Sequence, residues 1–141
     1  MLSIFKKKIF GDTASNSQDT PPYVSAVICL MIEIARLDGK IDENEMQEIK
    51  GFYEEAYPNG NFSEIFKDLM DLTSHKESFN PFINIINSNC SKKIKLGILA
   101  NIWSVILSDG VIDPYEESLF MQIGDLLMIN EHELLAIKNS S

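Results

Sequence analysis

The sequence predicts an all-α protein of about seven helices, arranged as two pseudo-symmetric helix-corner-helix halves packed around two buried central helices. Three observations support this fold class. Two stretches carry apolar residues almost all round the helical wheel, which is typical of helices surrounded by other helices. Amphipathic stretches with recognisable capping residues lie between and after them. Clean alternation of apolar and polar residues bounded by hairpin turns is not found, so strands are not expected.

The two expected central helices are the first and the fifth. Residues 23–38 place apolar side chains such as Val27 and Ile34 on every side of the wheel, with few charged residues among them. Residues 96–107, which include Trp103 and belong to the expected helix over 91–108, show the same distribution. A helix of this composition cannot be left facing water, so each half offers one buried helix to the other.

The other five helices are recognised by their starts. Each start pairs a capping side chain with a first-turn acid or a proline. The pairs are Asp42 with Glu45, Asn61 with Glu64, Asn80 with Pro81, Asp113 with Pro114, and Asn130 with Glu133. In order along the chain, the expected helices span roughly 23–38, 42–57, 62–74, 80–88, 91–108, 113–127 and 130–138.

An internal repeat organises these helices. Two segments superpose with a constant shift of 71 residues, "IARLDGKIDENEMQEI" and "VILSDGVIDPYEESLF". The matched pairs are Asp38 with Asp109, Gly39 with Gly110, Ile41 with Ile112, Asp42 with Asp113, and Glu45 with Glu116. Each segment runs from the end of a central helix into the start of the next helix. The repeat therefore predicts two equivalent corners, one in each half.

Composition bounds the domain organisation and the partners. The chain has 141 residues, 45% of them apolar, which is enough for one compact domain. Residues 11–22 are small and polar and end in two prolines, so we expect a basic tail and flexible linker over 1–22 and a domain over 23–141. Three of the 12 basic and two of the 21 acidic residues precede residue 23, which leaves the domain a net charge of −10. This charge repels a phosphate backbone, and we expect no nucleic-acid partner.

The corner sequences resemble the second half of a calcium-binding EF-hand loop. In the first corner, Asp38, Asp42 and Glu45 fall at three of the ligand positions of such a loop. Its two earliest ligand positions are Ile34 and Arg36, and both are apolar in the second copy. An apolar side chain cannot ligate a hard cation and a guanidinium repels one. Neither corner is therefore a complete EF-hand.

Folding alone explains most of the corner motif. We expect each copy to use a glycine in the left-handed conformation, an apolar plug, an aspartate N-cap and a glutamate that completes a capping box. These residues are Gly39, Ile41, Asp42 and Glu45 in the first copy, and Gly110, Ile112, Asp113 and Glu116 in the second.

Asp38 and Asp109 are not explained in this way. A carboxylate in the last turn of a helix faces the negative end of the helix dipole, which costs about 0.3–1 kcal/mol. Two interpretations stay open. Either the side chain accepts hydrogen bonds from backbone N–H groups of the following turn, or the acidic residues gather around a divalent cation of unknown identity. The candidate metal ligands are Asp38, Asp42, Glu45, Asp109, Asp113 and Glu116.

Other reactive residues carry little signal. Cys29 and Cys90 lie in apolar segments without CxxC spacing, which predicts buried free thiols and suits a reducing cytoplasm. His75 and His132 belong to no recognised metal or catalytic motif, and no nucleophile motif or glycine-rich phosphate loop is present. We therefore expect no catalytic residues and no bound cofactor other than the cation.

The first ten residues, "MLSIFKKKIF", combine apolar residues with Lys6, Lys7 and Lys8. Their order differs from that of a secretory signal, and no segment reaches the ~18 uninterrupted apolar residues that a membrane span needs. Two alternatives remain for this tail. It makes a weak contact with an anionic membrane surface through the three lysines, or it is solvated or packs on the domain.

The doubled "DG-x-I-D-x-x-E" element on an acidic, all-helical chain resembles the TerB-like tellurite-resistance family over about residues 23–138. This resemblance implies a compact seven-helix domain of bacterial stress systems, with no established catalytic activity. It also implies action at the cytoplasmic membrane face beside an integral membrane protein, and a metal site at the acidic residues matched above. Pro114 and Tyr115 depart from the small or charged residues usual at this corner.

The resulting expectation is a non-enzymatic, cytoplasmic stress-response domain that binds a partner protein, with a divalent cation at the paired corners. The alternatives are a metal-ion sensor or buffer, and a hydrolytic enzyme that uses the same carboxylates. A peripheral position at the inner membrane face follows from the resemblance and from the basic tail.

Overall fold

The computed structural model describes residues 23–38, 40–74, 79–108 and 110–140. These residues form seven α-helices and one 3-10 helix, and no strand occurs among them. The elements are α3 (Tyr23–Ala35), η2 (Arg36–Asp38), α4 (Glu43–Ala56), α5 (Phe62–Ser74), α6 (Asn80–Asn89), α7 (Lys92–Leu107), α8 (Pro114–Leu126) and α9 (Glu131–Asn139). The predicted all-α class is confirmed, and each helix ends within a few residues of its predicted limit. The tail and linker expected over 1–22 lie outside the described residues.

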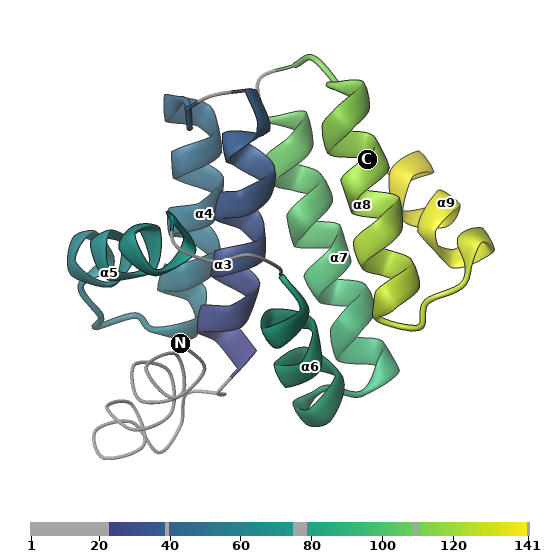
Figure 1. Ribbon diagram of the computed structural model, residues 1–141, viewed down its shortest axis with the longest axis horizontal. Coiled ribbons are helices and arrows are strands. Elements are labelled where there is room, and N and C mark those ends of the chain that lie inside the picture. Colours follow the sequence, from purple (N-terminus) through teal and green to yellow (C-terminus); the bar gives the residue numbers. More distant parts are fainter. Residues whose placement is uncertain (1–22, 39, 75–78, 109, 141) are drawn as a thin grey trace.

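The two helices predicted to be central form the middle of the molecule. Eleven of the 13 residues of α3 are buried, because α3 packs against α4, α5, α6, α7 and α8. Helix α7 in turn packs against α3, α4, α8 and α9. Figure 1 shows α4, α3, α7 and α8 running side by side, with α5 and α9 at the two sides and α6 low in the middle of the view. Burial of nearly every side chain of α3 makes this helix the main source of hydrophobic stabilisation.

Both corners lie at the same end of this row of helices. The connection from α3 to α4 and the connection from α7 to α8 both stand at the upper end in Figure 1. The other connections, such as that from α8 to α9, lie elsewhere. The repeat therefore places its two copies at one end of the molecule, while the proposed pseudo-symmetry of the halves stays a prediction.

Most of the predicted helix starts have the expected caps. The side chain of Asn61 accepts a hydrogen bond from Glu64 N at 3.2 Å, and that of Asn130 accepts one from Glu133 N at 2.9 Å. The cap predicted at Asn80 is wrong, because α6 already begins at Asn80 and Phe79 holds the N-cap position. Pro81 is tolerated at the second helical position, where its missing N–H has no intrahelical partner to lose.

The C-terminal end of α8 is closed by contacts that join three helices. Met128 has φ 66°, and Ile129 N donates to Gly124 O at 3.0 Å, which is the hydrogen-bond pattern of a Schellman motif. Asn87 Nδ2 donates to Leu126 O at 3.1 Å, and the buried Lys95 Nζ donates to Leu127 O at 3.1 Å. A positive charge at the negative end of a helix dipole is stabilising, so Lys95 ties α7 to α8 favourably.

The two cysteines are free thiols, as predicted, but they differ in burial. Cys29 is fully buried in α3, whereas Cys90 is only half-buried between α6 and α7. Burial raises the pKa of the Cys90 thiol to about 11, although nearby Lys95 acts in the opposite direction. The Cys90 thiol is therefore not readily ionised near neutral pH. Among the helices of the described ranges, none combines the length and apolar character required to span a bilayer.

Candidate functional site

The first corner contains a complete capping box. Asp42 Oδ1 accepts a hydrogen bond from Glu45 N at 2.7 Å, and Glu45 Oε1 accepts one from Asp42 N at 3.0 Å. Glu45 is buried, and Ile41 is half-buried against the core, as predicted for an apolar plug. One oxygen of each carboxylate is thus already engaged in closing the start of α4.

The second corner has a different geometry, and the capping box predicted at Asp113 and Glu116 is wrong. Gly110 has φ 82°, which confirms the predicted left-handed residue, and its N–H donates to Leu107 O at 3.0 Å. Asp113 Oδ1 accepts a hydrogen bond from Tyr115 N at 2.7 Å, which belongs to the second helical position rather than the third. Glu116 is buried, like its counterpart in the first corner.

The plug predicted at Ile112 is wrong, because 44% of this residue is exposed. Proline restricts the residue before it to ψ values of about 120–160°. Asp113 precedes Pro114 and has ψ 127°, whereas Asp42 precedes Glu43 and has ψ 174°. The proline therefore gives the second corner a different backbone conformation, in which the side chain of Ile112 is exposed and does not pack in the core.

The predicted metal ligands are only partly described. Asp42, Glu45, Asp113 and Glu116 lie at the two corners, while the side chain of Asp38 and all of Asp109 lie outside the described residues, as does Gly39. Within the described part of the chain, no three His, Cys, Asp or Glu residues are placed to hold a metal ion. The metal site therefore stays a prediction, and it depends on Asp38 and Asp109.

Exposed apolar side chains gather at the second corner, a feature that was not predicted from the sequence. Val111 is 68% exposed and Tyr115 is 77% exposed. Ile112 and Leu37 are also exposed, and Leu37 belongs to the first corner at the same end of the molecule. We call these four residues the corner surface. Two adjacent apolar residues in a turn otherwise built from Ser, Asp, Gly and Pro were the sequence signal that could have identified it.

The first turn of α8 is linked to the core through a charged contact. Glu117 Oε2 forms an ion pair with Lys138 Nζ of α9 at 2.5 Å. The same Lys138 Nζ lies 5.6 Å from the ring centre of the buried Trp103, which packs against Phe120 at 4.9 Å between ring centres. A cation over an indole face is favourable by about 0.5–2 kcal/mol. This chain of contacts connects the start of α8 with both α7 and α9.

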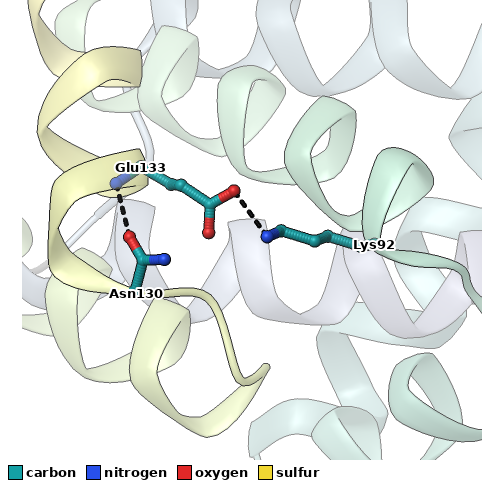
Figure 2. Close-up of polar contacts among 3 residues, drawn as sticks. All are labelled: Lys92, Asn130 and Glu133. Carbon is teal, nitrogen blue, oxygen red and sulfur yellow. Dashed lines mark hydrogen bonds and ion pairs between the residues drawn. The ribbon is translucent and has the colours of Figure 1, made fainter.

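A second ion pair joins the starts of α7 and α9, away from the corners (Figure 2). Lys92 Nζ lies 2.7 Å from Glu133 Oε2, while Glu133 N donates to Asn130 Oδ1. The hydrogen bond from Lys92 is the main reason why the pKa of Glu133 is lowered. His132 is exposed beside this pair, and His75 lies outside the described residues. The arrangement fixes α9 against α7 and leaves the corner surface as the better candidate for recognition.

Comparison with known proteins bears on the family. The family described as "Tellurite resistance protein TerB" matches this chain over residues 24–139. No curated protein and no solved structure matches the chain closely enough to add to this result. The family match covers all seven helices except the first residue of α3. This chain therefore belongs to the TerB family.

Proposed function

We propose that this protein is a non-enzymatic, cytoplasmic stress-response domain that acts by binding a partner protein at its corner surface. The observation that carries the proposal is the exposure of Val111, Ile112 and Tyr115 within five consecutive positions, beside the capped start of α8. Large apolar side chains gathered on a surface are typical of interaction sites. Tyr is also one of the residues that contribute most to binding energy when they become buried in an interface.

The position of the corner surface supports the same proposal. Seven large apolar residues are exposed in the described part of the chain, and four of them belong to the corner surface. The second corner is held in place by the packing of α8 on the core and by the ion pair between Glu117 and α9. A partner would therefore bind a surface that is already fixed by the fold. A surface that is ordered before binding loses less conformational entropy in the complex.

A tagged full-length chain used as bait in a lysate of the native host tests the proposal. We expect the double variant Val111→Ser with Tyr115→Ser to lose a partner that the unmodified chain retains. Met128→Ser is the matched control, because Met128 is similarly exposed but lies at the opposite end of α8. A partner retained equally by both variants would place the interaction elsewhere on the molecule.

A divalent cation is the second part of the proposal. Asp38, Asp42 and Glu45 would hold it in the first corner, and Asp109, Asp113 and Glu116 in the second. Carboxylate oxygens are the ligands that hard cations prefer, and the capping box at the start of α4 uses Oδ1 of Asp42 and Oε1 of Glu45. The cation would neutralise carboxylates that lie close to the corner surface and so change which partners that surface accepts.

Thermal unfolding in EDTA, followed by excess calcium, magnesium, manganese or zinc, tests the cation. A cation at one hundred times its dissociation constant adds about 2.7 kcal/mol to the free energy of unfolding. We expect Asp38→Asn to abolish the part of this gain that comes from the first corner. In EDTA the same variant should be neutral or slightly stabilising, because a charge at the unfavourable end of a helix dipole is removed. If no ion shifts the unfolding temperature, the cation and the alternative role as a metal-ion sensor or buffer are both refuted, and partner binding stands alone.

A further inference from the structure

We propose that residues 1–10 of this chain occupy the corner surface in cis, so that a partner has to displace them. The inference rests on the proposed function, since it assigns an internal competitor to the same docking surface. It makes the N-terminal segment a regulator of partner binding. The proposal follows from the chemistry of the surface, the chemistry of the segment and the length of chain between them.

The second corner of this surface combines exposed apolar groups with acidic ones. Residues 107–117 carry four acidic residues and no basic one. Asp113 is half-buried and Glu117 is paired with Lys138, while Glu43 of the first corner is exposed. A segment that binds here should therefore be apolar and cationic.

The first ten residues have this chemistry. They include the apolar residues Leu2, Ile4, Phe5, Ile9 and Phe10, three lysines and no acidic residue. The remainder of the chain, residues 23–141, carries a net charge of −10, so attraction alone does not select one face. The apolar side chains determine which face is bound, because their burial is favourable only where other apolar groups are exposed.

The other exposed apolar residues fit this segment less well. They are Ile94, Met128 and Leu135, one each in α7, the α8–α9 turn and α9. Ile94 follows Lys92 and Lys93, which repel a cationic segment. Met128 and Leu135 are separated along the chain, and the apolar neighbours of Met128, Leu127 and Ile129, are buried, whereas Val111 and Ile112 are adjacent and both exposed. Among the described residues, the corner surface therefore brings the largest number of exposed apolar side chains together beside acidic residues.

The intervening chain is long enough for this contact. Residues 11–22 can span about 40 Å when extended, at about 3.3 Å per residue. The start of α3 lies about 20 Å from its corner end, since the helix has 13 residues that each rise about 1.5 Å. Such a tether gives an effective concentration of the order of 1 mM. If the segment binds the surface with a dissociation constant of about 0.1 mM, it lowers the apparent affinity of a competing partner on the order of tenfold.

A nitroxide label on the tail of the full-length chain tests this contact. Ser3→Cys introduces a reactive thiol, and the two native thiols are protected by burial and by the raised pKa of Cys90. The parent chain, treated with the same reagent, controls for any labelling of Cys90. We expect the label to broaden the backbone amide signals of residues 107–117 and 36–45 more than those of residues 128–135.

Three further variants locate the contact. The broadening should fall at least severalfold in the labelled chain carrying Lys6→Gln, Lys7→Gln and Lys8→Gln, and again in the labelled chain carrying Val111→Ser and Tyr115→Ser. It should persist with Met128→Ser. High salt should reduce it, because the charge complementarity of exposed groups is screened.

Several outcomes would overturn the inference. Broadening that is absent, or centred away from the corner surface, refutes docking at this site. Broadening that appears only when labelled chains are mixed with separate isotope-enriched chains would assign the surface to a second copy. Sedimentation of the chain with anionic vesicles, without broadening at the corners, would indicate that residues 1–10 bind a lipid surface instead. If partner capture still depends on Val111 and Tyr115 while the tail is absent from them, the proposed function stands and only the cis contact fails.

Discussion

Close packing between α8 and α9 at Gly124 makes a quantitative prediction for Gly124→Ala. A Cβ atom added at Gly124 would lie 2.4 Å from Leu134 Cδ2, 2.6 Å from Cδ1 and 3.0 Å from Cγ. Real Cβ atoms do not approach other carbons so closely, so the whole Leu134 side chain would have to move. Leu134 is buried, which leaves it little space for another rotamer.

The expected effect is the balance of two terms. Inserting a methyl group into a packed core costs about 1–3 kcal/mol. Replacing glycine by alanine within a helix returns about 1 kcal/mol through helix propensity. The matched control is Gly51→Ala in α4, where no atom lies within 4 Å of the added Cβ and only the propensity term applies. The difference between the two variants is therefore the cost of overpacking, about 1–3 kcal/mol.

Urea unfolding followed by circular dichroism measures both free energies. We expect Gly51→Ala to be more stable than the unmodified chain and Gly124→Ala to be less stable than Gly51→Ala by the stated amount. The pair Gly124→Ala with Leu134→Ala should be less destabilised than the sum of the single variants, because the added methyl group fills part of the space that leucine leaves. Equal stabilisation by Gly51→Ala and Gly124→Ala would refute the close contact between α8 and α9.

Three further predictions concern the backbone and one ion pair. Gly110→Ala should lower the free energy of unfolding by about 1 kcal/mol, measured by urea unfolding, because its φ of 82° is unfavourable for alanine although no atom crowds the new Cβ. Met128→Gly should raise it by up to about 1 kcal/mol in the same assay, since the exposed methionine holds φ 66°, and any loss of stability would contradict this. The pKa of Glu133 is lowered in the folded chain from its ordinary 4.5, so its contribution is present above pH 4.5 and is lost as the pH falls through the folded value. The difference in melting temperature between the unmodified chain and Lys92→Met should therefore be largest near neutral pH and vanish in acid, and a constant difference would exclude the ion pair as its source.

The features that could be predicted from the sequence are those set by local chemistry. The capping box of Asp42 and Glu45 involves residues three positions apart, and the turn at Gly110 depends on one glycine. Helix ends follow from such signals, and burial of α3 follows from its composition. Both kinds of information lie within one or two helical turns, so the helices could be placed to within a few residues.

The features that could not be predicted depend on contacts between distant residues or on a local conflict. Lys95 closes α8 through a hydrogen bond to Leu127, 32 residues away, and no pattern in either segment announces it. Met128 adopts a left-handed conformation for which glycine or asparagine is the usual residue, so this conformation could not be predicted from the sequence. At Ile112, matching the repeat suggested a buried plug, but Pro114 changes the backbone before it and exposes the side chain.

The placement of the single tryptophan gives the unmodified chain an optical reporter of its own corner. Trp103 is buried, and the ammonium group of Lys138 that lies over its indole ring is held there by Glu117 in the first turn of α8. A ligand that draws Glu117 toward itself would release the ammonium group and change the electric field at the indole. The intensity and wavelength of intrinsic emission should therefore respond to occupancy of this end of the molecule, and a titration could be followed in a fluorimeter without attaching any dye.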